Sequence, residues 1–164
     1  MSDVQQHWLS LADEAATEAL GARLALALPV SDVPLVLYLQ GDLGAGKTTL
    51  ARGLLRALGE SGAVRSPTYA LLAEYEPRPA LRVLHLDLYR LNGPDELVAL
   101  GLADHLPGSR AWLVEWPERA GGAGLPAPDA WIHLEPVDGA RRARLVPLTA
   151  AGRAWMDATA QDSG

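Results

Sequence analysis

The sequence predicts an α/β sandwich of three layers, in which helices cover both faces of a mixed, mostly parallel sheet with antiparallel additions. Residues 34–39 (PLVLYL) form a short, nearly continuous apolar run, typical of a strand buried on both faces. A glycine-rich segment and a helical pattern follow it directly, and strand and helix patterns mix along the rest of the chain. With 164 residues, we expect one domain over residues 1–150 and a C-terminal helix or disordered tail over residues 151–164.

The patterns before residue 60 predict a helix, the apolar strand and a second helix. Ser10 and Asp13 resemble a capping pair, and apolar residues at helical spacing follow, so we expect the first helix over residues 11–27. Residues 47–58 place four leucines at helical spacing, and Gly59 follows as a stop signal. The second helix therefore begins within the glycine-rich segment.

The next segments predict a loop and two further strands. Residues 60–68 (ESGAVRSPT) have the composition of a loop. Residues 69–75 and 81–88 are β-like, and the segment Pro77 to Pro79 separates them. We therefore expect two antiparallel strands beside the parallel core.

A third helix is expected over residues 94–106 (PDELVALGLADHL). It begins with a proline, which suits the first helical position. Val98, Leu102 and Leu106 lie four residues apart on one face, and Pro107 then stops the helix.

The last third of the chain predicts three more strands and a short helix. Residues 112–114 form a short apolar strand, and residues 120–129 (AGGAGLPAPD) form a loop. Residues 131–135 and 142–146 are expected to pair around an Asp-Gly turn. A short helix around Trp155 is expected to fray toward the end of the chain.

Residues 41–48 (GDLGAGKT) fit the pattern G-x-x-x-x-G-K-[ST], in which backbone N–H groups surround phosphates and the lysine reaches the β and γ oxygens. Lys47 is the only lysine beside thirteen arginines. A compact ammonium can enter such a loop, whereas a guanidinium is broader and favours two-pronged contacts. The preceding strand and following helix supply the context that the motif requires, and the helix N-terminus adds partial positive charge. We therefore expect a nucleotide phosphate site, the alternative being a chance glycine-rich turn.

A phosphoryl-transfer site also needs a metal ion, held by Thr48 and an acidic residue at the end of a neighbouring strand. Asp87 ends the segment LHLD and Glu115 ends AWLVE, and the local sequence does not decide which is closer to magnesium. Each is otherwise an ordinary polar strand end. Thr68, in the segment RSPTY, is a candidate switch threonine that meets the metal or the γ-phosphate, or else a residue that caps a strand.

Composition limits the function classes. The net charge of −6 argues against a protein that grips nucleic acid mainly through its own surface. The absence of cysteine excludes disulfides, and no apolar run approaches 18 residues, so we expect a cytoplasmic protein without a membrane partner. No N-K-x-D segment is present, which disfavours GTP. Arg65 and Arg119 are candidates to stabilise transition-state charge in cis, although isolated arginines are usually surface residues. If no arginine acts in cis, we expect slow hydrolysis that a partner accelerates.

Five segments resemble, in order and spacing, the bacterial TsaE (formerly YjeE) ATPases of tRNA threonylcarbamoyladenosine synthesis. They are GDLGAGKTTLARGLLRALG, SPTYALLAEY, LHLDLYRL, DELVALGL and WLVEWPER, and the resemblance spans roughly residues 10–135. It implies a P-loop NTPase fold, binding of ATP and ADP with Mg²⁺, and ATP hydrolysis. It also implies association with TsaB and TsaD, which carry out the transfer to adenosine 37 of tRNA, so that tRNA is met only through that complex.

The resemblance also implies roles for single residues. Thr48 and Glu115 would hold magnesium, Asp87 would support the metal or the attacking water, and Thr68 would be a switch-like threonine. Lys47 would contact the β- and γ-phosphates. The phosphates as a whole would be bound by Gly44, Ala45, Gly46, Lys47, Thr48 and Thr49.

Three further residues are candidate nucleotide contacts through the resemblance. Trp116 would lie near the nucleotide, the alternative being a buried aromatic at a strand end. Asp13 and Thr17 would contact the adenine, although helix capping and surface exposure explain them equally well. The segment after Val137 matches no motif. Two other functions stay open: a small-molecule kinase, and a nucleotide-gated binding module with negligible hydrolysis.

Overall fold

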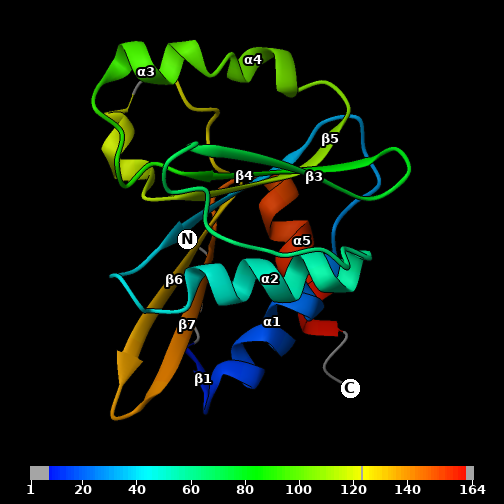
Figure 1. The fold of residues 1–164 in the computed structure, drawn as a ribbon. Helices are drawn as coiled ribbons and strands as arrows, with labels where there is room; N and C mark the ends of the chain where they lie inside the picture. The colour runs from blue at the N-terminus through cyan, green and yellow to red at the C-terminus, as the bar shows by residue number, and fades with distance from the viewer. Residues whose placement is uncertain (1–7, 123, 162–164) are drawn as a thin grey trace.

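Seven strands form one sheet at the centre of the computed structural model, which describes residues 8–122 and 124–161 (Figure 1). The strand order is β1-β7-β6-β2-β5-β4-β3. The central strands β6, β2, β5 and β4 are parallel, while β3, β7 and β1 each pair antiparallel with a neighbour. The strands are β1 (Trp8–Leu11), β2 (Leu35–Gln40), β3 (Leu72–Arg78), β4 (Leu81–Asp87), β5 (Ser109–Glu115), β6 (Ala130–Val137) and β7 (Ala140–Pro147).

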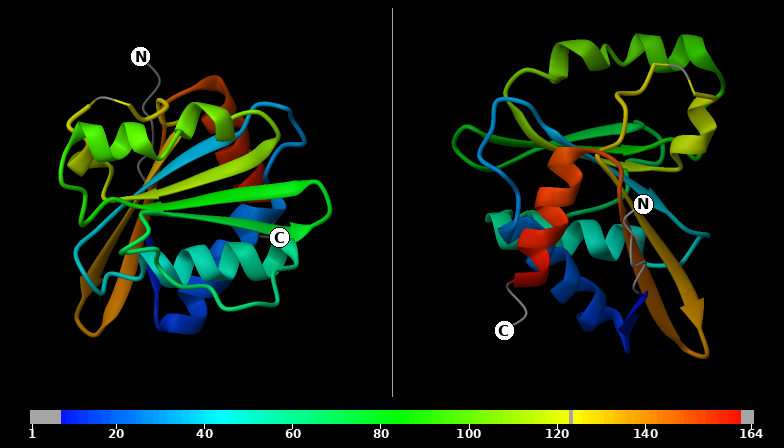
Figure 2. Two further views of the ribbon diagram at one scale, coloured as in Figure 1. Left: turned by 45° about the horizontal axis from the view of Figure 1, so that its top comes forward. Right: turned by 180° about the vertical axis from the view of Figure 1, so that it is seen from behind.

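Helices cover both faces of this sheet, which confirms the expected α/β sandwich of three layers (Figures 1 and 2). On one side lie α1 (Glu14–Leu26), α2 (Lys47–Leu58) and α5 (Ala150–Gln161). On the other lie α3 (Pro94–Ala99), α4 (Leu102–His105) and the 3₁₀ helix η1 (Pro117–Ala120). In β2, Leu37 faces the cluster that contains Trp155, and the next residue, Tyr38, faces the cluster that contains Leu97. This alternation explains why the strand is apolar at nearly every position.

Two glycines allow α1 and α2 to pack closely. An ideal Cβ on Gly53 would lie well inside 3.0 Å of the carbonyl oxygen of Glu18, and one on Gly21 equally close to that of Leu50. Real Cβ atoms essentially never approach backbone this closely. The packing matters for function because α2 begins at the glycine-rich loop.

The expected first helix starts later than predicted, because Asp13 and not Ser10 caps it. The Asp13 carboxylate accepts a hydrogen bond from the backbone N–H of Ala16 at 2.8 Å. Ser10 instead belongs to β1, which pairs with β7 and which the sequence did not reveal. The capping pair and the helix over residues 11–13 are therefore wrong.

The helix expected over residues 94–106 is two short helices. Gly101 lies between them with φ of 62°, a left-handed conformation that interrupts the helical hydrogen bonds. Val98 is 74% exposed while its neighbour Leu97 is buried, so the predicted apolar face was misplaced by one residue. Leu102 is buried as expected.

The strands after the second helix also differ from expectation. Tyr69 lies in a turn and β3 runs from Leu72 through Pro77 to Arg78, with a register shift near its end. β4 pairs parallel with β5, so it belongs to the parallel core, and only β3 is an antiparallel addition on that edge. The hairpin of β6 and β7 around Asp138 and Gly139 is confirmed.

The C-terminal segment forms a helix that packs against the core. Trp155 is buried on α5, and its indole N–H donates to the carbonyl oxygen of Leu24 in α1 at 3.0 Å. Residues 162–164, to which the expected fraying extends, lie outside the described residues. None of the helices in the described part of the chain is long and apolar enough to cross a membrane.

Candidate nucleotide-binding site

The glycine-rich loop connects β2 to α2 at the edge of the sheet where the parallel strands end. β2 ends at Gln40 and α2 begins at Lys47. Leu39 of β2 pairs with Glu115 of the neighbouring strand β5, and Glu115 pairs in turn with Asp87 of β4. The two acidic strand ends therefore lie in register beside the loop. Ligands of open α/β sheets bind at this carboxyl edge.

Two glycines give the loop its shape. Gly44 and Gly46 have φ of 80° and 105°, which side chains rarely permit. Ala45 is buried, and its N–H donates to the carbonyl oxygen of Asp42 at 3.0 Å. The loop borders a pocket of about 200 Å³, lined by Leu43, Gly44, Gly46, Lys47, Thr48, Thr49, Ser66, Asp87, Glu115, Trp116 and Arg141.

Lys47 is only 5% exposed and projects into the pocket region. Its ammonium donates to the carbonyl oxygen of Gly41 at 2.5 Å and lies 3.7 Å from the centre of the Trp116 ring. Burial lowers the pKa of Lys47, and the nearby carboxylates of Glu115 and Asp87 oppose that shift. A phosphate group in the pocket would add further negative charge beside this buried cation.

The two acidic residues are buried and joined by hydroxyl groups. Glu115 is 2% exposed and Asp87 is 5% exposed. The hydroxyl of Thr48 donates to both carboxylate oxygens of Glu115 at 3.5 Å. The hydroxyl of Ser66 donates to Asp87 and lies 3.3 Å from Oε2 of Glu115. The backbone N–H of Tyr89 donates to the other oxygen of Asp87 at 3.0 Å.

These side chains fit a magnesium ion. They offer two hydroxyls and two carboxylates, and hard oxygen ligands suit Mg²⁺. Among the described residues, no three His, Cys, Asp or Glu side chains cluster as a complete metal site. Mg²⁺ does not require one, because it commonly takes one or two carboxylates together with substrate phosphates and waters. Of the two acids, Glu115 is the one in contact with Thr48.

Thr68 lies at the edge of this group. Its hydroxyl is 3.5 Å from Oδ2 of Asp87, while Ser66 makes the closer contact with the same oxygen. Sequence reasoning missed Ser66, although it belongs to the same RSPTY segment. It also missed His85, whose Nε2 lies 2.6 Å from Oε2 of Glu115 with both side chains buried. The spacing of two residues in LHLD, which places His85 and Asp87 on one face of a strand, was the available signal.

Trp116 follows β5 in a left-handed conformation, with φ of 56°. Non-glycine residues adopt this conformation at a cost, and such strain clusters at functional sites. The ring lies beside the ammonium of Lys47, and its centre is 5.0 Å from that of the Tyr89 ring. Trp116 therefore lines the pocket and is only partly buried.

Asp13 and Thr17, the candidate adenine contacts, do not line this pocket. Asp13 caps α1. Thr17 is fully buried, and its hydroxyl donates to the carbonyl oxygen of Asp13 at 3.3 Å. Surface exposure therefore does not account for a polar residue at position 17.

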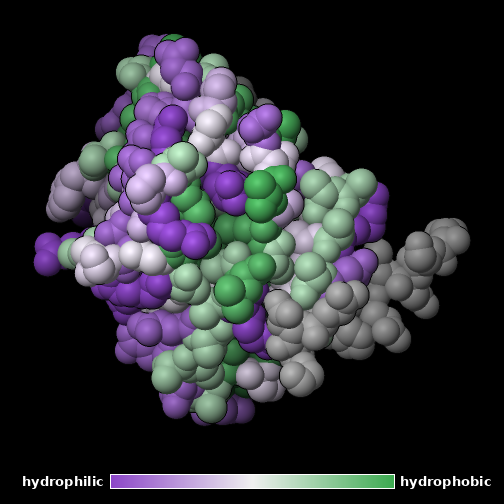
Figure 3. Space-filling model, turned by 90° about the vertical axis from the view of Figure 1, so that its right-hand side faces the viewer, coloured by the Kyte–Doolittle hydropathy of each residue, from purple (hydrophilic) through white to green (hydrophobic). Residues whose placement is uncertain are grey.

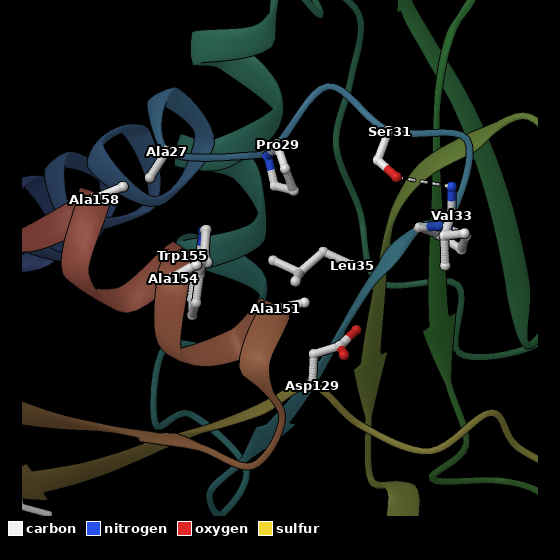
Figure 4. A pocket seen from close by; sticks show the side chains of 11 residues that line it. Ala27, Pro29, Ser31, Val33, Leu35, Asp129, Ala151, Ala154, Trp155 and Ala158 are labelled. Carbon is white, nitrogen blue, oxygen red and sulfur yellow. Dashed lines mark hydrogen bonds between the residues drawn. The ribbon is translucent and has the colours of Figure 1, made fainter.

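A second pocket, of about 380 Å³, lies at the opposite end of β2, near Leu35 (Figure 4). The loop between α1 and β2 borders it on the side of the molecule where hydrophobic residues form a band (Figure 3). Its one carboxylate, Asp129, accepts hydrogen bonds from the N–H of Val36 at 2.8 Å and the hydroxyl of Thr149 at 2.7 Å. The side chains that could contact phosphate or a metal ion therefore lie at the glycine-rich loop and not in this second pocket.

Comparison with known proteins identifies the family. A model of the family described as "Threonylcarbamoyl adenosine biosynthesis protein TsaE" matches residues 11–144. The tRNA threonylcarbamoyladenosine biosynthesis protein TsaE of Haemophilus influenzae is 42% identical over 119 residues, which cover 73% of this chain and 74% of that protein. The protein of the same name from a Nostoc species is 37% identical and covers 84% of each chain. The crystal structure of Bacillus subtilis YdiB superposes with a TM-score of 0.79 at 26% identity, covering 100% of both chains.

Proposed function

The chain belongs to the TsaE family, and from this we propose that it is a magnesium-dependent ATPase that supports formation of N6-threonylcarbamoyladenosine at position 37 of tRNA through TsaB and TsaD. The names of its relatives support a role in the biosynthesis of this nucleoside. The hydrolysis, the metal and the two partners are the parts that we propose.

The single observation that carries the proposal is the position of Lys47 between the glycine-rich loop and the two acids. The ammonium of Lys47 and the N-terminus of α2, with its unpaired backbone N–H groups, favour an anion in one place. ATP and ADP both carry such an anion.

The buried hydroxyl and carboxylate oxygens give this chain the means to hydrolyse ATP. Thr48 and Glu115 would hold magnesium, which when bound neutralises charge on the β- and γ-phosphates. Asp87 would orient the attacking water, because its carboxylate already accepts hydrogen bonds from Ser66 and Tyr89, which fix its direction. The hydroxyl of Thr68 lies close to Asp87, so it could contact the metal or the γ-phosphate when ATP binds.

The charge of the chain supports a role for partners. At a net charge of −6, the protein has little electrostatic attraction for the tRNA backbone, so we assign RNA binding to TsaB and TsaD. Hydrolysis by this chain would then reset the complex instead of modifying RNA directly.

Reconstitution tests the proposal. The chain is mixed with TsaB, TsaD, Mg²⁺, ATP, a threonylcarbamoyl donor and tRNA, and both modified adenosine per TsaD and released phosphate are counted. We expect several turnovers with the wild type, and none above background with Lys47→Ala. The exposed Arg153→Ala variant on α5 serves as the control and should behave as the wild type.

Other outcomes identify the alternatives. No gain over a mixture without this chain would reject the role in tRNA modification. Modification without phosphate release, unaffected by Glu115→Gln, would indicate a nucleotide-gated binding module. Transfer of the γ-phosphate to a small molecule would indicate a kinase.

A further inference from the structure

Arg141 lies against the glycine-rich loop, although it comes from the hairpin that matched no motif. An ideal Cβ on Gly46 would lie 2.7 Å from Nη1 of Arg141, and Arg141 lines the same pocket as Lys47. A side chain at position 46 would therefore collide with this guanidinium. Glycine at position 46 therefore permits both the left-handed turn of the loop and the close approach of Arg141.

The sheet explains how β7 reaches the loop. β2 ends at Gln40, which pairs with His133, while β6 continues to Val137. The hairpin therefore extends past the end of β2 (Figure 1). Within β7, Ala143 and Leu145 face the core on the α1 and α2 side, and Arg141 shares their face because side chains alternate along a strand. Arg141 thus points toward the N-terminus of α2.

The guanidinium of Arg141 has unused hydrogen-bonding capacity. Its Nη1 atom is buried and has no hydrogen-bond partner among the described residues. A buried donor without a partner is costly, and a charged one more so. An anion in the adjacent pocket would satisfy it.

The position of Arg141 relative to the acids indicates which part of the nucleotide it meets. Asp87 and Glu115 end β4 and β5, on one side of β2, whereas Arg141 comes from β7, beyond β6 on the other side. A magnesium ion held by Thr48 and Glu115 would neutralise charge on the β- and γ-phosphates, so the acids would mark that end of the triphosphate. The opposite side of the loop would then face the α-phosphate and the nucleoside.

We propose that Arg141 binds the α-phosphate end of the bound nucleotide, and so acts equally on ATP and ADP. This rests on the proposed nucleotide-binding function. It differs from a transition-state role, in which an arginine contacts the γ-phosphate and affects hydrolysis without affecting ADP.

The test compares Arg141→Met with Arg142→Met. Arg142 is the matched control, since it is the next residue, lies on the opposite face of β7 and pairs there with Glu135 and the Trp8 ring. Dissociation constants for Mg-ADP and for a non-hydrolysable Mg-ATP analogue are measured by calorimetry. Phosphate release at saturating ATP is measured in the complex with TsaB and TsaD.

We expect Arg141→Met to raise both dissociation constants by the same factor, about 10- to 100-fold, the usual worth of a charge-assisted hydrogen bond. The rate at saturating ATP should stay within about twofold of the wild type. Arg141→Lys, which keeps the charge, should recover part of the affinity, and Arg142→Met should match the wild type. Unchanged affinities in Arg141→Met would overturn the inference, as would a loss for the ATP analogue alone. If the wild type bound neither nucleotide, the proposed function itself would be wrong.

Discussion

The ammonium of Lys47 lies 3.7 Å from the centre of the Trp116 ring and donates to the carbonyl oxygen of Gly41. The ring and the carbonyl together hold the cation in the pocket where phosphates would bind. A nucleotide must therefore compete with these two contacts for Lys47. Nucleotide binding would consequently change the surroundings of Trp116.

We expect the fluorescence of Trp116 to report nucleotide binding. Adding ADP should change the tryptophan emission of the wild type, because the charge beside the ring is partly neutralised. The chain has five tryptophans, so the signal is assigned with Trp116→Phe, in which the change should disappear. Trp8→Phe should retain the change, since Trp8 does not line the pocket. A signal that persists in Trp116→Phe would show that the ring is not coupled to the site.

We expect the affinity for ADP to fall as the pH rises. Because the pKa of Lys47 is lowered, the fall should begin at a lower pH than it would with an ordinary lysine. Burial lowers the pKa of Lys47 in the free protein, whereas bound phosphates favour the charged form and raise that pKa. Binding should therefore take up protons at a pH below that at which an ordinary lysine titrates. Calorimetry in two buffers of different ionisation enthalpy measures this uptake. The absence of any proton uptake at alkaline pH would contradict this prediction.

The same shift affects folding with a definite sign. Because the pKa of Lys47 is lower in the folded than in the unfolded protein, the unfolded chain binds more protons between the two values. The contribution of Lys47 to the free energy of unfolding should therefore rise with pH across that window. Urea unfolding at several pH values, compared between the wild type and Lys47→Met, measures it.

The sequence was most informative where local chemistry decides structure. The apolar run before the loop, the spacing of Gly41, Gly46 and Lys47, and the leucines of α2 are all contained in 25 consecutive residues. The strand-end acids Asp87 and Glu115 could also be found, because parallel strands end at one edge of the sheet. These features sufficed for the fold class and for most of the pocket.

Features that depend on distant pairing were missed. β1 is only four residues long, and only its pairing with β7 defines it as a strand. Arg141 reaches the loop because β6 and β7 extend past β2, which no local pattern reveals. The break at Gly101 was missed because the apolar spacing on either side continues through it.

Glu115→Gln should abolish the effect of magnesium on ATP binding while leaving the fold intact. The substitution keeps the shape of the side chain and its contacts with His85 and Thr48, but removes a buried charge near that of Asp87. Magnesium should then no longer strengthen ATP binding, whereas binding of ADP in EDTA should change little. Calorimetry with and without Mg²⁺ measures both. Glu118→Gln removes the same charge from an exposed position outside the pocket and should respond to Mg²⁺ as the wild type does.

Gly53→Ala should destabilise the protein by about 1–3 kcal/mol, the usual cost of overpacking. Alanine in place of glycine within a helix would by itself stabilise it by about 0.5–1 kcal/mol, so the clash decides the sign. The added methyl group would meet the backbone of Glu18, which cannot move unless α1 shifts relative to α2. In the control Gly62→Ala, the methyl group meets only the flexible side chain of Glu60, and the change should stay within about 0.5 kcal/mol. Urea unfolding compares the two variants. A Gly53→Ala protein as stable as the wild type would mean that α1 and α2 do not cross this closely, and that the position of the loop does not depend on their contact.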